Sequence, residues 1–330
     1  MADSLQNLIH PPQFHAGLIA GLIVLAVLAP VALDRARRGR SAGVAGLGFT
    51  IAAVVGITGI GPFPGHRHVS AAFVGGLALA FVLTAMARRV GTSGPGGALL
   101  LVAAAAPGAA VVAGSLTGVE AWVRVVVAAT GALAGAGAAD FDGAWRGRGL
   151  GPVLVLVTAG AVYSTVPDTE AARALVGAAL ALALLAWPTL QAALGAPGAV
   201  TAMCVIAWVV GQDGAARPGA VVGGAGAVGL FVLEPVARRI RPGNRERAVQ
   251  SPVLEAIHLV GIQLVVAFGA ARFAGLERDA GAAALRLAVV AVVGVVLALG
   301  LPAVGAARAS GAVRPPPDRA PRQPGRAPLQ

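Results

Sequence analysis

The chain has 330 residues, of which 57% are hydrophobic and only 12% are charged. Soluble domains carry about 25% charged residues, so the composition excludes a water-soluble globular protein of this length. The net charge of +11 comes from 25 arginines with no lysine, and in so apolar a chain it reports membrane topology rather than nucleic-acid binding.

Eleven apolar stretches divide the chain, and short polar loops separate them. A helix needs about 20 mainly apolar residues to span a membrane, and irregular backbone cannot face the lipid core because its polar groups would stay unpaired. We therefore predict an all-α, polytopic membrane protein with about eleven transmembrane helices in a domain of residues 14–306. The predicted helices cover residues 14–33, 44–63, 69–87, 97–116, 119–139, 150–166, 171–190, 198–212, 219–237, 252–272 and 283–306.

The arginines fall mainly on one side of the predicted helices. Eighteen of the 25 lie in the loops after the odd-numbered helices, counted from the N-terminus, or in the C-terminal segment. Arginine-rich loops stay in the cytoplasm, so we predict an extracytoplasmic N-terminal segment (residues 1–13) and a cytoplasmic C-terminus. Residues 307–330 alternate arginine with proline and cannot bury apolar surface, which predicts a disordered cytoplasmic tail.

Few ionisable side chains lie inside the predicted helices, where a buried charge is costly and seldom retained without a function. Glu234, Glu255 and His258 lie near the cytoplasmic ends of two consecutive helices, where three such groups suit a proton relay, a metal site or a structural polar cluster. Gln263 lies deeper, and hydrogen bonding between helices is its expected role. Trp208 lies near a predicted helix end and is expected to anchor that helix at the membrane interface.

Five segments on the predicted cytoplasmic side, called here the five loop segments, carry basic, acidic or small residues in a fixed order. Residues 37–48 form an arginine-rich loop that leads into a glycine-rich helix start, and residues 81–89 end in Arg88-Arg89. The third and fourth segments read Asp140-Phe141-Asp142-Gly143 and Gly195-Ala196-Pro197-Gly198-Ala199. In the fifth, Glu234-Pro235 precedes Arg238-Arg239 and Pro242-Gly243.

The order of the five loop segments resembles that of the polyprenyl-phosphate N-acetylhexosamine-1-phosphate transferases. This family includes the phospho-N-acetylmuramoyl-pentapeptide transferase of peptidoglycan synthesis, and its members have ten or eleven helices with cytoplasmic active-site loops. The resemblance covers residues 14–272 and implies a multi-pass protein of the bacterial plasma membrane. It also implies polyprenyl phosphate as the membrane lipid that the protein binds, and a place in cell-envelope polymer assembly.

The catalytic carboxylates of that family are missing from this chain. Leu83 and Thr84 stand where the family has an Asp-Asp pair, and Ala196 replaces its metal-binding aspartate. Transfer of a sugar phosphate needs Mg²⁺ held by carboxylates, which these three side chains cannot supply. We therefore expect no bound metal and no other cofactor. The remaining candidates for a catalytic carboxylate are Asp142 and Asp140.

The first hypothesis is a catalytically inactive relative of these enzymes, with a binding or scaffold role beside other envelope-synthesis proteins. The side chains expected to bind a polyprenyl phosphate are Arg38, Arg40, Arg88, Arg89, Arg238, Arg239 and His258. The second hypothesis is an active Mg²⁺-dependent transferase that uses Asp140 and Asp142. The third is a transporter of lipids or other small molecules, built on an apparent repeat of residues 81–89 in residues 231–239. Chance also explains such a match in a chain so rich in alanine and valine.

Overall fold

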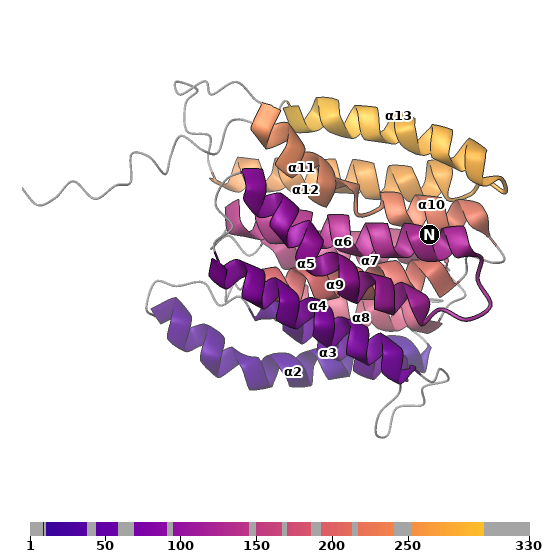
Figure 1. Ribbon diagram of the computed structural model, residues 1–330. Coiled ribbons are helices and arrows are strands. Elements are labelled where there is room, and N and C mark those ends of the chain that lie inside the picture. Colours follow the sequence, from indigo (N-terminus) through magenta and orange to yellow (C-terminus); the bar gives the residue numbers. More distant parts are fainter. Residues whose placement is uncertain are drawn as a thin grey trace, which may run out of the picture.

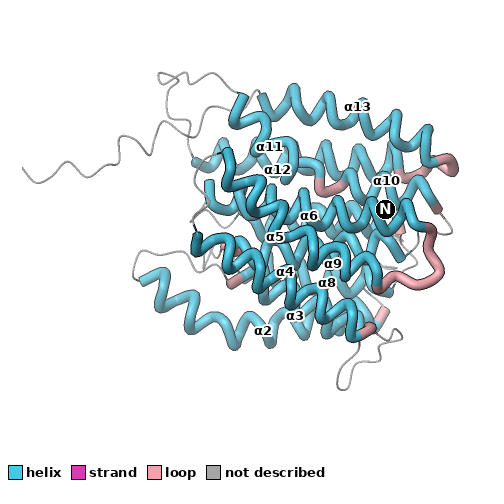
Figure 2. Tube along the Cα trace, viewed as in Figure 1, coloured by secondary structure: helices cyan, strands magenta, loops and turns pink. Residues whose placement is uncertain are grey.

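The chain forms a bundle of helices whose axes run roughly parallel or antiparallel to one another, as the computed structural model shows (Figure 1). The structure describes residues 9, 11–37, 44–58, 69–90, 95–144, 150–166, 170–185, 193–212, 217–240 and 252–299. Within these ranges the chain forms helices and short loops and no strand, which confirms the predicted all-α class (Figure 2). Residues 1–8 and the predicted tail over residues 307–330 lie outside the described residues.

Each of the eleven predicted apolar stretches contains helical structure. In chain order the helices are α2 (Pro12–Arg37), α3 (Ala45–Thr58), α4 (Ala71–Val90), α5 (Pro95–Gly114), α6 (Ala121–Ala144), α7 (Leu150–Thr165), α8 (Glu170–Leu185), α9 (Ala196–Gln212), α10 (Pro218–Gly226), α11 (Gly229–Ile240), α12 (Pro252–Gly269), the π-helix η2 (Ala270–Ala274) and α13 (Ala280–Leu299). The described loops lie at the ends of the bundle, except for the turn at residues 227–228, which interrupts the path from α10 to α11 (Figure 2).

The helices differ in length, and this decides which of them are able to cross a membrane alone. Within the described ranges, the helices long and apolar enough for this are α2, α4, α5, α6, α12 continued by η2, and α13. The bent pair of α10 and α11 makes a seventh candidate. Helices α3, α7 and α9 are apolar but have only 14, 16 and 17 residues. The described part of the chain is therefore an all-α protein with six or seven helices suited to crossing a membrane.

Helix α9 forms the centre of the bundle. It packs against α3, α4 and α6, and nearly every one of its side chains is buried, because a helix that is apolar on all sides is stable only when other helices surround it. Cys204 is free and buried here. Trp208 is also buried: its Nε1 donates to Ser115 Oγ at 3.1 Å and its ring lies 4.6 Å from that of Phe73. The prediction that Trp208 anchors a helix at the interface is therefore wrong.

The single helix predicted over residues 219–237 is interrupted. Helix α10 ends at Gly226, α11 begins at Gly229, and the two axes differ by 40°. Glycines at 223, 224, 226 and 229 weaken this stretch, because each lowers helix stability by about 1 kcal/mol relative to alanine. The carbonyl of Ala227 at the break accepts a hydrogen bond from Gln263 Nε2 of α12 at 3.0 Å. The tertiary structure thus stabilises a break that the apolar pattern does not predict.

Helices α3 and α9 approach one another backbone to backbone. A Cβ atom added at Gly46 would lie 2.5 Å from the carbonyl carbon of Gly198, and one added at Gly198 would lie 2.6 Å from the backbone nitrogen of Leu47. Small residues permit this close approach, which is typical of helix packing in membranes. The contact fixes α3 against α9 and thereby positions the site described next.

Candidate functional site

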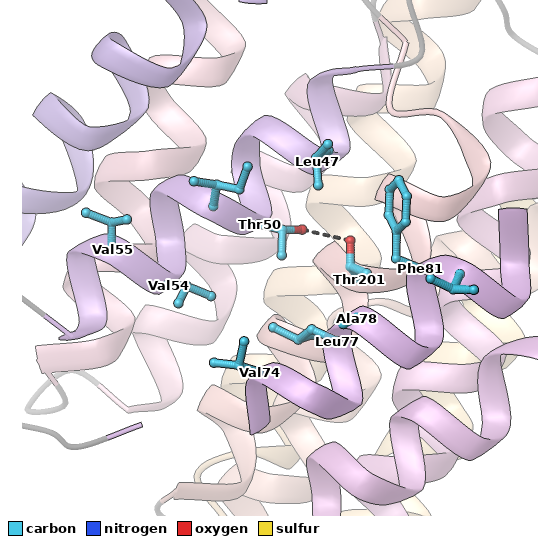
Figure 3. Close-up of a pocket in the computed structure, with 11 residues that line it drawn as sticks. Leu47, Thr50, Val54, Val55, Val74, Leu77, Ala78, Phe81 and Thr201 are labelled. Atoms are coloured by element: carbon cyan, nitrogen blue, oxygen red, sulfur yellow. Dashed lines mark hydrogen bonds between the residues drawn. The ribbon is translucent and has the colours of Figure 1, made fainter. Parts of the chain in front are cut away.

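An apolar groove with a cavity volume of about 410 Å³ lies between α3 and α4 and is closed below by α9 (Figure 3). We call it the α3–α4 groove. Its walls are formed on α3 by Leu47, Ile51, Val54 and Val55, and on α4 by Val74, Leu77, Ala78, Phe81 and Val82. The two helices run in opposite directions, so Leu47 lies at the same end as Phe81 and Val54 at the same end as Val74 (Figure 3).

Two threonines form the floor of the α3–α4 groove, and their hydroxyls are engaged within the protein. Thr50 Oγ1 and Thr201 Oγ1 lie 2.9 Å apart, and both side chains are buried. One hydroxyl donates to the other, and the second donates to a backbone carbonyl oxygen of its own helix: that of Gly46 lies 2.9 Å from Thr50 Oγ1, and that of Gly198 lies 3.1 Å from Thr201 Oγ1. With these hydroxyls satisfied, the groove offers a ligand almost only aliphatic surface, which suits a hydrocarbon chain.

The basic end of α4 continues from the Phe81 end of the groove. Arg88 and Arg89 lie in the last turn of α4, with Arg88 half-buried and Arg89 exposed. Arg88 follows Phe81 by seven residues, which corresponds to about 10 Å along the helix axis. A ligand with its chain in the groove would therefore place a headgroup near these two guanidinium groups.

The other predicted phosphate ligands do not join this site. Arg38 and Arg40 lie outside the described residues, and the side chains of Arg238 and Arg239 in α11 are likewise not described. His258 is exposed on α12, which packs against α7, α11 and α13, whereas α4 packs against α5 and α9. The structure therefore places His258 and Arg88 in different parts of the bundle.

Asp142 connects two of the five loop segments. Its carboxylate is buried at the end of α6, where Oδ1 accepts a hydrogen bond from the backbone N–H of Leu194 at 2.8 Å and Oδ2 from that of Gly195 at 3.1 Å. Gly195 has φ +73°, a left-handed conformation that favours glycine, and α9 begins at the next residue. Asp142 thus fixes the entry to α9. Asp140, the other candidate carboxylate, is half-buried.

Sequence reasoning missed this structural role of Asp142. The available signal was the Gly195-Ala196-Pro197 sequence, because proline is favoured in the first turn of a helix and the first backbone N–H groups of that helix need an acceptor. Nothing in the sequence identifies the acceptor, since Asp142 lies 52 residues before Leu194. A carboxylate engaged with two backbone donors has less capacity left to hold a metal ion.

The three ionisable residues predicted as a relay, metal site or polar cluster are only partly described. Glu234 is fully buried in α11, His258 is exposed, and the side chain of Glu255 is not described. No three His, Cys, Asp or Glu side chains come together as a metal site among the residues searched, which are those that the structure describes. Thr84, which the resemblance aligns with a family aspartate, is buried, and within the described part of the chain its hydroxyl has no hydrogen-bond partner.

Comparison with known proteins adds no family to these observations. The chain matches no protein-family model, and it matches no curated protein. The resemblance to the sugar-phosphate transferases therefore rests on the five loop segments alone.

Proposed function

We propose that this protein binds a polyprenyl-phosphate lipid in the α3–α4 groove and does not transfer a sugar phosphate to it. The observation that carries this proposal is the groove itself, an open cavity of about 410 Å³ lined by Leu, Ile, Val, Ala and Phe side chains. Burial of hydrocarbon against such a surface is favourable and needs no polar partner, and a branched isoprenoid chain matches walls of branched side chains.

The lipid phosphate would lie at the cytoplasmic end of α4, beside Arg88 and Arg89. This placement follows from the proposed topology, in which the helical stretches make about eleven crossings of a bacterial plasma membrane with the arginine-rich loops inside. Guanidinium groups form paired, charge-assisted hydrogen bonds to phosphate oxygens, so two adjacent arginines suit a phosphate monoester. Arg38 and Arg40, which precede α3 in the sequence, remain predicted ligands of the headgroup.

The absence of catalysis in this proposal rests on four positions. Leu83, Thr84 and Ala196 stand where the resembling family has carboxylates, and Asp142 holds the entry to α9 through both of its oxygens. A binding protein of this kind would hold or present the carrier lipid to other proteins of envelope-polymer assembly. Mg²⁺-dependent release of UMP from a UDP-sugar by the purified protein would contradict this part of the proposal.

Filling the groove should abolish lipid binding. Ala78 lines the groove and is exposed, so an Ala78→Trp substitution fills the cavity without displacing the core. We expect at least a tenfold weaker affinity for polyprenyl phosphate, which corresponds to about 1.4 kcal/mol. Binding of a fluorescent polyprenyl phosphate to purified protein in nanodiscs measures the effect.

A matched control for Ala78→Trp is available on the far side of the bundle. Ala288 is exposed on α13, which packs against α10, α11, α12 and η2 and lies at the opposite edge from α3 (Figure 1). An Ala288→Trp substitution adds the same side chain to a lipid-facing helix and should leave the affinity unchanged. Equal affinities for wild type and Ala78→Trp would rule out the α3–α4 groove as the lipid site.

Neutralising Arg88 and Arg89 at the end of α4 should weaken binding only of the ligand that carries a phosphate group. Each arginine near an anionic lipid surface contributes about 1 kcal/mol, so Arg88→Gln and Arg89→Gln should each lower the affinity about fivefold. The uncharged polyprenol, which lacks the phosphate, should bind all variants equally. If both ligands lose affinity to the same extent, the arginines act on the protein structure and do not contact the headgroup.

A further inference from the structure

A buried polar cluster lies where the interrupted helix α10–α11 meets α7 and α12. Gln263 Nε2 donates to the carbonyl oxygen of Ala227 at 3.0 Å and to Thr158 Oγ1 at 2.7 Å. Thr158 Oγ1 in turn donates to the carbonyl oxygen of Leu154 at 2.8 Å. Gln263, Thr158 and Ala227 are each 0% exposed. The cluster therefore contains a helix break, a side-chain amide and a hydroxyl, all shielded from the surroundings.

The hydrogen bonds fix the orientation of the Gln263 amide. The Ala227 carbonyl can only accept, and Thr158 accepts from Gln263 because it gives its own proton to Leu154. Both contacts therefore require the NH₂ end of the amide, and the oxygen Oε1 must lie on the other side. Oε1 is buried and has no hydrogen-bond partner among the residues that the structure describes. Burying a carbonyl oxygen without a donor costs free energy of folding. A cation or a hydrogen-bond donor beside Oε1 would therefore stabilise the protein.

The cluster lies near the middle of the helices that form it. Thr158 is in the middle of α7 (Leu150–Thr165), Gln263 is in the middle of α12 with η2 (Pro252–Ala274), and the break divides Pro218–Ile240 near its centre. In a protein that spans a membrane this is the depth of the bilayer midplane. Interrupted helices at that depth are typical of ion sites, because unwound carbonyl oxygens and the negative ends of half-helices attract cations.

Two further features lie along the helices that form the cluster. Glu234, which is fully buried, follows Ala227 on α11 by seven residues, about 10 Å along a helix. The π-helix η2 begins seven residues after Gln263 and packs against α10. Single π-helical turns in a long helix are frequent at functional sites. No arginine or histidine contributes to the described hydrogen bonds of the cluster.

We propose that a small monovalent cation binds beside the break between α10 and α11, with Gln263 Oε1 as a ligand. The bound cation supplies the positive charge that Oε1 lacks and stabilises the amide orientation in which Gln263 Nε2 joins α12 to α7 and to the break. This site is separate from the α3–α4 groove, because its residues lie on α7, α12 and the α10–α11 break, whereas the groove is lined by α3, α4 and α9.

The test is the thermal stability of purified wild-type protein in detergent at constant ionic strength, with NaCl, KCl, NH₄Cl or choline chloride. We expect the unfolding midpoint to rise saturably with Na⁺, K⁺ or NH₄⁺ relative to choline, whose bulk excludes it from the site. The ranking of the three identifies the cation. Equal midpoints in all four salts would overturn the proposal, and they are the result expected if an ordered water molecule satisfies Oε1.

Two glutamine variants assign the response to this site. Gln263→Met preserves the volume but removes the oxygen, and it should raise the cation concentration for half-maximal stabilisation at least tenfold. Gln13→Met is the matched control: Gln13 is a buried glutamine on α2 whose Nε2 donates to Glu170 Oε1 at 3.0 Å, far from the break. It should retain the wild-type response. A response retained in Gln263→Met, or lost in Gln13→Met, would place the cation elsewhere.

Discussion

Asp142→Ala should destabilise the protein by about 3 kcal/mol, since each hydrogen bond to a buried charged group contributes about 1.5–3 kcal/mol. The carboxylate accepts from the N–H groups of Leu194 and Gly195, and its loss leaves both donors unpaired beside a buried Leu194. These donors directly precede the central helix α9, so their loss of an acceptor also weakens the packing of α9 in the core. Denaturant unfolding in mixed micelles, followed by tryptophan fluorescence, measures the change in unfolding free energy.

A solvated cap provides the control for Asp142→Ala. Asp279 Oδ2 accepts from the backbone N–H of Ala282 at the start of α13 at 2.8 Å, but this hydrogen bond is exposed and water can replace it. Asp279→Ala should therefore cost much less than Asp142→Ala. An equally small effect at both positions would show that Asp142 does not hold the entry to α9.

A second variant at this position separates a structural role of Asp142 from a catalytic one. Asp142→Asn keeps the size of the side chain and one acceptor oxygen, so it should retain part of the stability that Asp142→Ala loses. If Asp142 were instead the catalytic carboxylate of an active transferase, Asp142→Asn would abolish Mg²⁺-dependent UMP release without a matching loss of stability. Measuring both quantities on one protein preparation therefore distinguishes the two roles.

The helical architecture follows from the sequence because membrane helices are specified locally. A run such as residues 198–212 is apolar on all faces, and the structure makes it α9, beginning two residues earlier at Ala196. The number of membrane crossings is less directly determined by local sequence than the positions of the helices are. Helix α3 has 14 described residues where 20 were predicted, and six or seven of the described helices have the length and composition for a crossing.

The parts that could not be predicted depend on contacts between helices distant in the chain. The break at Ala227 needs Gln263, 36 residues later, and the burial of Trp208 needs Ser115, 93 residues earlier. Both copies of the apparent repeat are helical, but the residues before them differ: α4 begins ten residues before residue 81, whereas α11 begins at Gly229, only two residues before residue 231. Local sequence similarity does not determine this difference.

The candidate site was likewise predictable only in part. Arginine pairs next to apolar helices are visible in the sequence, and Arg88-Arg89 lies at the helix end where it was expected. The α3–α4 groove was not predicted. Its walls come from two helices whose facing side chains are all aliphatic or aromatic. The groove forms because α3 and α4 both pack against α9, and this packing cannot be predicted from either helix alone.

Gly76→Ala should destabilise the protein by about 2 kcal/mol, and Gly76→Val by about 3 kcal/mol, because added atoms cannot be accommodated at the contact of α4 with α5. A Cβ atom at Gly76 would lie 2.8 Å from the backbone nitrogen of Val112 and 3.0 Å from the carbonyl oxygen of Gly108. Backbone atoms cannot rotate aside, so the two helices must separate. The loss is read from denaturant unfolding in micelles.

Gly75, which precedes Gly76 on α4, provides a matched control. A Cβ atom at Gly75 would meet no atom within 4 Å, so Gly75→Ala should instead stabilise α4 by about 0.5–1 kcal/mol through the lower flexibility of alanine. In the double variant Gly76→Ala/Val112→Ala, recovery should be only partial. The smaller side chain removes the contact with Val112 Cγ2 at 2.8 Å but leaves the contact with its backbone nitrogen. Full recovery would mean that α4 and α5 meet only through side chains, contrary to the packing that positions the wall of the α3–α4 groove.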